Sequence, residues 1–238
     1  MSDDPKRIVE SGYDAIASRF GAWRAAIRSP DEEWLSDLLA RLPERASVLE
    51  LGCGQAGAAR QILAAGHRYT GVDISAEQLR YARELVPEAD FRRADVTEIT
   101  LDADSLDAVV ALYVFGHVPR AELPGLLERI ASSLRPGGYL LATFARSGTE
   151  GVQDEWLGVP MFFGSYTDGQ TLALIGDAGL AVERAEVVPI VEPEEGEARF
   201  LWTLVRRPPG RREPPLRPPG GPAAARARAA PPRPRGRG

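Results

Sequence analysis

The chain has 238 residues, with 29 lysines and arginines, 34 aspartates and glutamates, and one cysteine, Cys53. This length suits one α/β domain or one domain plus a tail, and a single cysteine excludes a disulfide scaffold and a cysteine-rich zinc module, so we expect no metal centre. No apolar run approaches the roughly 20 residues of a membrane helix, and the charged start MSDDPKRIVE is unlike a signal peptide, so a soluble cytoplasmic protein without membrane contacts is expected.

The net charge of −5 conceals two regions of opposite sign. Residues 206–238 contain ten arginines, ten prolines, one glutamate and no aromatic residue, so they carry +9, whereas residues 1–205 carry −14. The composition of 206–238 predicts a disordered tail, because it offers too little apolar surface to offset the entropy of ordering. Its arginines reflect either compositional drift, since Lys6 is the only lysine, or a basic arm for an acidic partner. The acidic remainder repels phosphate backbones, so no nucleic-acid partner is expected.

Strand-like and helix-like segments alternate along residues 1–205. In chain order, the pattern predicts helices over 5–28 and 31–41, a strand over 46–51, a helix over 55–65, a strand over 69–73, a helix from 75 to about 85, strands over 89–93 and 105–113, a helix over 120–134, a strand over 139–144, an irregular segment over 146–166, a helix from 167 to about 179, and strands over 181–190 and 197–205. This alternation, which ends in a hairpin, predicts a single α/β domain with a doubly wound, mostly parallel sheet.

The most specific local feature is a glycine loop, Glu50-Leu-Gly-Cys-Gly-Gln-Ala-Gly57, between a predicted strand and a predicted helix. Gly52, Gly54 and Gly57 satisfy the pattern G-x-G-x-x-G, in which glycines permit a tight turn and let a ligand approach the backbone N–H groups at the start of a helix. Asp73 lies 21 residues after Gly52, at the end of the next strand, where it could accept hydrogen bonds from two ribose hydroxyls. The alternative is a purely structural turn.

Glu50 indicates which nucleotide the loop would hold. An acid just before the loop would repel the pyrophosphate of a dinucleotide but would favour a ligand with a cationic amino group. Asp95, which follows the third predicted strand, could accept a hydrogen bond from an adenine amine, with Val96 and Ile74 on the two faces of the ring.

Five motifs in this order resemble those of the class I S-adenosylmethionine-dependent methyltransferases: Val48-Leu-Glu-Leu-Gly-Cys-Gly54, Gly71-Val-Asp-Ile-Ser75, Arg93-Ala-Asp-Val96, Leu106-Asp-Ala-Val-Val110 and Leu134-Arg-Pro-Gly-Gly138. The resemblance covers roughly residues 10–205. It implies a Rossmann-like, seven-stranded sheet whose last strand is antiparallel, with S-adenosylmethionine as the cofactor. By this resemblance, the two loop glycines line the methionine portion, and the acids after the second and third strands meet the ribose and the adenine.

Together, the loop chemistry and the resemblance give a set of expected cofactor-binding residues: Tyr13, Glu50, Gly52, Cys53, Gly54, Asp73, Ile74, Gln78, Asp95, Val96 and Leu112. Tyr13 resembles an N-terminal tyrosine that often caps this cofactor, which would make residues 1–42 a helical lid. Tyr13 could equally be a buried packing residue.

The segment 146–166 is predicted to cover the substrate, because it holds too many large apolar side chains for a bare loop. The candidate substrate residues are Tyr113, Trp156, Met161, Phe162, Phe163 and Tyr166. They could instead pack this segment on the core or form a dimer contact, so a monomer and a homodimer both remain open.

Two histidines need an interpretation. His117 follows the fourth predicted strand, at the edge where open α/β sheets bind ligands, and an ordinary histidine pKa suits a general base near neutrality. The alternative is that His117 packs against the cofactor or caps the next helix. His67, just before the second strand, is expected to lie in an exposed loop.

Three functions are compatible with these features. The first is methyl transfer to an O or N atom of a small-molecule acceptor, with secondary metabolism as one setting. The second is methylation of nucleic acid or protein. Enzymes that methylate the amino groups of nucleic acids resemble one another in sharing an Asn/Asp-Pro-Pro-aromatic motif after the fourth strand, and Ala111-Leu-Tyr-Val-Phe-Gly116 lacks it. The third is a protein that binds the cofactor without catalysis.

Overall fold

The computed structural model describes residues 4–193 and 196–209. Its elements in chain order are α1 (Pro5–Ala26), α2 (Asp31–Leu39), β1 (Ser47–Leu51), α3 (Ala59–Ala64), β2 (Arg68–Asp73), α4 (Ala76–Leu85), β3 (Asp90–Arg93), β4 (Leu106–Ala111), the 3₁₀ turn η1 (Phe115–His117), α5 (Leu123–Ser133), β5 (Leu134–Phe144), β6 (Glu150–Trp156), β7 (Val159–Gly164), α6 (Asp168–Asp177), β8 (Ala181–Glu192) and β9 (Gly196–Arg206). Among the described residues, no helix combines the length and apolarity needed to cross a bilayer.

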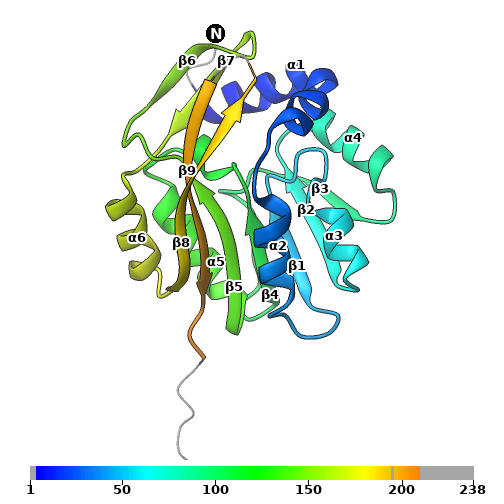
Figure 1. Ribbon diagram of the computed structural model, residues 1–238, viewed down its shortest axis with the longest axis vertical. Coiled ribbons are helices and arrows are strands. Elements are labelled where there is room, and N and C mark those ends of the chain that lie inside the picture. Colours follow the sequence, from blue (N-terminus) through cyan, green and yellow to red (C-terminus); the bar gives the residue numbers. More distant parts are fainter. Residues whose placement is uncertain (1–3, 194–195, 210–238) are drawn as a thin grey trace, which may run out of the picture.

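The main sheet has seven strands in the order β3-β2-β1-β4-β5-β9-β8 (Figure 1). The first five strands of this order are mutually parallel, whereas β9 runs antiparallel to both of its neighbours. The predicted Rossmann-like α/β sheet with an antiparallel last strand is therefore confirmed. The strand order reverses between β1 and β4, and this topological switch point, at the carboxyl ends of the two strands, is where doubly wound sheets bind ligands.

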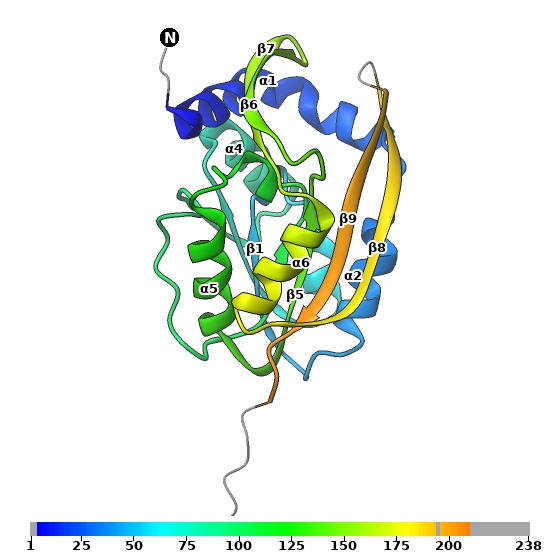
Figure 2. The ribbon, with the colours of Figure 1, turned by 90° about the vertical axis from the view of Figure 1, so that its left-hand side faces the viewer.

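Helices cover both faces of the sheet, which explains why the central strands are apolar on both sides. On β4, Val110 packs with α2, α3 and α4 on one face, whereas Val109 packs with α5 and α6 on the other. Figure 2 shows α2 on the opposite side of the sheet from α5 and α6. Helix α1 and the β6–β7 hairpin lie across the carboxyl edge of the sheet and are tied to each other by a third apolar cluster. This edge is therefore covered by two segments, α1 and the β6–β7 hairpin, that lie far apart in the sequence.

The segment 146–166, predicted to be irregular, instead contains the antiparallel β6–β7 hairpin. Leu157 and Gly158 form its tight turn, and both have positive φ, 49° and 74°, as the mirror-image turns of two-residue hairpins require. The prediction failed because most of β6 is exposed, so it lacks the alternation of apolar and polar residues that identifies a half-buried strand.

Helix α3 begins at Ala59 rather than at Gln55 as predicted. The intervening backbone cannot be a continuous helix, because Ala56 has a positive φ of 65°. The glycine loop is thus longer than the sequence pattern indicated.

The predicted boundary of the tail at residue 206 is also wrong. Strand β9 continues to Arg206, and the backbone of Arg207 forms hydrogen bonds with Gly137 and Gly138. The Arg207 side chain donates to Asp104 Oδ1 at 2.6 Å. Residues 210–238, for which disorder was predicted, lie outside the described residues.

His67 does not lie in an exposed loop as predicted; it is buried, with 9% of its surface exposed. Its Nδ1 accepts a hydrogen bond from the backbone N–H of Ala46 at 3.1 Å. This contact fixes the start of β2 beside that of β1, so the role of His67 is structural.

Trp202 offers a test of the core on the α2 face of the sheet. Its side chain is fully buried, and its ring lies 5.5 Å from that of Trp34 and 5.8 Å from that of Tyr113. Trp202→Ala should lower the free energy of unfolding by about 3–5 kcal/mol, because it leaves a cavity, measured by urea unfolding. The control Val187→Ala, on the exposed side of β8, should change it by about 0.5 kcal/mol. Equal losses in the two variants would contradict this description of the core.

Candidate active site

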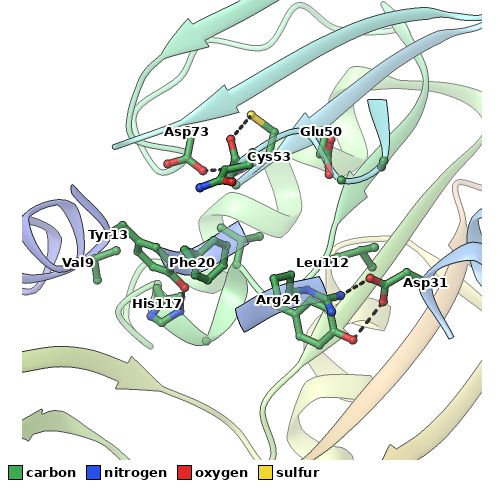
Figure 3. A pocket seen from close by; sticks show the side chains of 18 of the residues that line it. Val9, Tyr13, Phe20, Arg24, Asp31, Glu50, Cys53, Asp73, Leu112 and His117 are labelled. Atoms are coloured by element: carbon green, nitrogen blue, oxygen red, sulfur yellow. Dashed lines mark hydrogen bonds and ion pairs between the residues drawn. The ribbon is translucent and has the colours of Figure 1, made fainter. Parts of the chain in front are cut away.

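A cavity of about 840 Å³ lies between the carboxyl edge of the sheet and helix α1 (Figure 3). It is lined by every predicted cofactor-binding residue except one: Tyr13, Glu50, Gly52, Cys53, Gly54, Asp73, Ile74, Asp95, Val96 and Leu112. The exception, Gln78, is buried on α4 and donates from Nε2 to the carbonyl of Tyr13 at 3.4 Å. The backbone N–H of Gln78 also donates to the Ser75 hydroxyl at 3.0 Å, which caps the start of α4.

Two of the three loop glycines are required by the backbone. Gly52 has a φ of +65°, and a Cβ there would lie 2.5 Å from a methyl group of Val114. Gly54 has a φ of +49°, and its N–H donates to Asp73 Oδ2 at 2.8 Å. Gly57 has no positive φ, and a Cβ added there would meet no atom of the described residues within 4 Å, so the third glycine of the pattern has no steric role.

Asp73 is buried at the end of β2 and is held by two backbone donors. Oδ2 accepts from Gly54 and Oδ1 accepts from Ser75 N–H at 2.9 Å. Burial raises the pKa of Asp73 to about 6, against the opposing effect of these N–H donors. A carboxylate offers about four lone-pair positions, so two remain for a ligand. The residues fit a nucleoside whose ribose presents two neighbouring hydroxyls.

Glu50 lies at the end of β1 with 5% of its surface exposed. Tyr69, on the paired strand β2, donates its hydroxyl hydrogen to Glu50 Oε2 at 2.5 Å. Burial raises the pKa of Glu50 to about 8; the Tyr69 hydrogen bond opposes this rise and the charge of Asp73 adds to it. A cation entering the cavity would relieve the cost of ionising this acid, so the site fits a ligand with an ammonium group.

Asp95 lies at the other end of the cavity and also anchors α1. Its Oδ1 accepts from the N–H of Thr97 at 2.8 Å and from the Thr97 hydroxyl at 2.9 Å, and its Oδ2 lies 3.0 Å from Lys6 Nζ. Val96 and Ile74 line the cavity beside it. The first turn of α1 is therefore held at the place where the sequence predicts the adenine.

Tyr13 and His117 join α1 to the sheet edge (Figure 3). Tyr13 Oη lies 2.8 Å from His117 Nε2, and His117 Nδ1 lies 2.9 Å from the carbonyl oxygen of Phe162. Because a carbonyl can only accept, Nδ1 carries the proton and Nε2 accepts from the Tyr13 hydroxyl. Burial lowers the pKa of His117 to about 4. His117 is thus a neutral side chain with both nitrogens engaged, which is not the arrangement of a free general base.

An aromatic cluster covers the cavity on the side of α1 and the hairpin. It consists of Tyr13, Phe20, Trp23, Trp156 and Phe163, all of which line the cavity. Trp156 meets Trp23 and Phe163 edge to face, with ring centres 5.6 Å and 5.7 Å apart, whereas the rings of Phe20 and Trp23 are tilted by 32°. Such a wall suits an apolar or cationic ligand.

Three predicted substrate residues lie away from the cavity. Met161 packs on α1, where a Cβ at Gly12 would lie 2.6 Å from its terminal methyl, and Phe162 belongs to the same buried cluster. Tyr166 packs on the α5 face and donates to the carbonyl of Arg120 at 2.8 Å. The structure therefore brings only Tyr113, Trp156 and Phe163 of that set to the cavity.

The sequence reasoning missed Arg24 and Asp31, which line the cavity where α1 ends and α2 begins. They form an ion pair, and Asp31 also accepts from the Tyr113 hydroxyl at 3.2 Å. Tyr113 has a φ of +61°, a conformation that a non-glycine residue adopts at a cost of about 1–3 kcal/mol and that clusters at functional sites. The sequence offers only a weak signal for Arg24 and Asp31: a basic residue in the last turn of one helix is followed by acidic residues in the first turn of the next.

The raised pKa of Glu50 predicts a specific pH dependence of stability. Between its ordinary value of 4.5 and about 8, the folded protein holds a proton that the unfolded chain has released, so stability falls as the pH rises. Glu50→Gln should raise the unfolding temperature of the ligand-free protein by on the order of 5 °C at pH 8, and the gain should disappear towards pH 4.5. Thermal unfolding at several pH values checks this. The exposed Glu44→Gln serves as control, and a gain independent of pH would contradict the assignment.

Comparisons with known proteins agree with this geometry. A family model described as a methyltransferase domain matches residues 48–138. A trans-aconitate 2-methyltransferase of Delftia acidovorans is 34% identical over 164 residues, 65% of this chain and 56% of that protein. The chain spans about half the length of the curated relatives it matches, for example 46% and 56%.

Two solved structures share the fold. An S-adenosylmethionine-dependent methyltransferase from Mesorhizobium loti has a TM-score of 0.59 and 23% identity, over 72% of this chain and 96% of that one. The [4+2]-cyclase SpnF has a TM-score of 0.65 and 16% identity, over 84% and 95% of the two chains. The family model, the curated relatives and the glycine loop agree: residues 48–138 match a methyltransferase domain, the chain has the fold of the class I S-adenosylmethionine-dependent methyltransferases, and S-adenosylmethionine is the cofactor that these findings support.

Proposed function

We propose that the protein transfers the methyl group of S-adenosylmethionine to an O or N atom of a small-molecule acceptor. The observation that carries this proposal is a single cavity in which the glycine loop, Glu50 and Asp73 face an aromatic cluster. The wall with the glycine loop and the two acids is complementary to an amino-acid-bearing nucleoside, and the aromatic wall is complementary to an apolar organic molecule.

The cofactor, when bound, supplies a methyl group that its sulfonium has already activated. The chain's own task is then to align the acceptor with that carbon and to exclude water. Helix α1 and the β6–β7 hairpin cover the cavity with Tyr13, Trp23 and Trp156, which makes this region suitable for holding an acceptor away from solvent.

The charges of the cavity narrow the acceptor class. Its described charged residues are Lys6, Arg24, Asp31, Glu32, Glu50, Asp73, Asp95 and Glu192. Acids outnumber bases, so an acceptor with several carboxylates, such as the trans-aconitate for which the Delftia acidovorans relative is named, would be repelled. We propose a neutral or cationic acceptor with an apolar body, of the kind that tailoring enzymes of secondary metabolism modify.

The first experiment separates cofactor binding from transfer. Calorimetry should detect binding of S-adenosylmethionine and S-adenosylhomocysteine but not of NAD, and Asp73→Asn should weaken that binding by about tenfold to a hundredfold, because ribose hydroxyls lose a charged acceptor. Asp90→Asn, at an exposed aspartate on β3, is the matched control.

The second step presents methyl-labelled cofactor with panels of aromatic amines, phenols and polycarboxylates. Label should move to a member of the first two panels and not to the third. Binding of NAD in place of the nucleoside would refute the assignment of the cavity. Tight cofactor binding with no transfer to any small molecule would instead favour a binding protein or a macromolecular acceptor.

His117 is expected to position Tyr13 rather than to remove a proton. Because burial keeps its pKa at about 4, the turnover number kcat should show no inflection near pH 6.5 that depends on His117. His117→Asn should raise the cofactor KM and lower kcat by no more than about tenfold, whereas loss of a general base costs a factor of 10² to 10⁴. Tyr13→Phe, which removes only the donor of this hydrogen bond, should reproduce the KM effect. An inflection near pH 6.5 that disappears in His117→Asn would identify His117 as the base.

A further inference from the structure

The two basic residues among the described lining of the cavity lie in different surroundings. Lys6 is engaged by three carboxylates: its Nζ lies 3.0 Å from Asp95, 3.3 Å from Glu98 and 2.9 Å from Glu122. These contacts hold it at the Asp95 end. Arg24, in the last turn of α1, is paired instead with Asp31 at the start of α2 (Figure 3).

Arg24 is held in place but keeps donors for a ligand. Its ion pair with Asp31 and its 3.2 Å hydrogen bond to the Ser29 hydroxyl both use Nη2. Its guanidinium carbon lies 4.8 Å from the centre of the Tyr113 ring, and the unusual backbone of Tyr113 is fixed by a 2.6 Å hydrogen bond from its N–H to the Thr143 hydroxyl. The guanidinium is thus oriented by Asp31 and Tyr113, while the N–H groups on Nε and Nη1 remain available within the described part of the chain.

The amino-acid portion of the cofactor needs such a group. It carries an ammonium and a carboxylate on the same carbon, and Glu50 suits only the ammonium. The carboxylate would enter a cavity with Glu50, Asp73 and Asp31 on its walls, where an anion is unfavourable without a cation beside it. The planar fork of an arginine matches a carboxylate. In Figure 3, Glu50 and Arg24 come from the opposite walls of the cavity, β1 and α1.

We propose that Arg24 binds the carboxylate of the methionine portion and thereby makes the protein selective for the intact amino-acid-bearing nucleoside. Asp31 and Tyr113 act as positioning residues for the guanidinium. The inference rests on the proposed function, because it concerns the same cofactor.

The test compares S-adenosylhomocysteine with its decarboxylated counterpart, which keeps the amine and the thioether but lacks the carboxylate. Dissociation constants of both nucleosides are measured by calorimetry on the full chain. The wild type should bind S-adenosylhomocysteine at least tenfold more tightly than the decarboxylated form, the scale of a charged hydrogen bond. Arg24→Ala should weaken only S-adenosylhomocysteine, so that the ratio of the two constants falls to about one. Arg28→Ala, at an exposed arginine just beyond α1, is the matched control and should keep the wild-type ratio.

Each other outcome overturns the inference. Equal weakening of both nucleosides by Arg24→Ala would mean that Arg24 acts through the fold, and an unchanged ratio would mean that another group holds the carboxylate. If Arg24→Ala does not fold, Arg24→Gln, which can still donate to Asp31, is expected to give the same collapse of the ratio, and a preserved ratio refutes the proposal. A wild type that binds neither nucleoside refutes the proposed function as well, whereas equal wild-type affinities with methyl transfer intact refute only the role of Arg24.

Discussion

The structure depends on two carboxylates, Glu50 and Asp73, that are buried at the carboxyl edge of the sheet. Burying a carboxylate is costly unless hydrogen bonds or opposite charge compensate for it. The compensation here is partial: a tyrosine hydroxyl reaches Glu50, and two backbone N–H groups reach Asp73. The pKa values of both acids consequently lie above their ordinary range. The two acids therefore lower the stability of the folded protein at a site where a bound cationic nucleoside would supply the missing compensation. Such a trade of stability for function is common at binding sites.

The fold supplies this arrangement through a few constraints. Parallel pairing of β1 with β2 brings the two acids to neighbouring strand ends. The left-handed conformations of Gly52 and Gly54 turn the chain away from the sheet, so that the loop backbone faces the cavity. Helix α1 then closes the opposite side, held at one end by Lys6 and in its middle by Tyr13. Sheet, loop and lid therefore form one binding surface.

The sequence predicted the parts of this surface that depend on local order. The glycine loop and Asp73 are recognisable because strand, turn and helix follow one another within a short segment. The state of His117 was not predictable in this way, because it depends on Tyr13 and on the carbonyl of Phe162, which are 104 and 45 residues away along the chain.

The same limit explains the other differences. Phe163 and Met161 lie on the same strand and have similar apolarity, yet only Phe163 reaches the cavity, because Met161 packs on a glycine of α1. Arg24 carried no motif, and its position in the cavity lining becomes apparent only when α1 is placed over the sheet. Side-chain composition identifies a covering segment, but its contacts with the rest of the fold decide which residues of that segment face the ligand.

The cavity residues that suit the nucleoside and those that form the aromatic cluster lie in different segments of the chain. This separation affects how the acceptor can change during evolution. The segment that matches the family model, 48–138, contains the acids and glycines that suit the nucleoside. The aromatic cluster belongs entirely to α1 and the β6–β7 hairpin, outside that segment. A change of acceptor can therefore arise by exchanging peripheral segments while the nucleoside half is inherited unaltered, so kinship in the central segment is a poor guide to what is methylated.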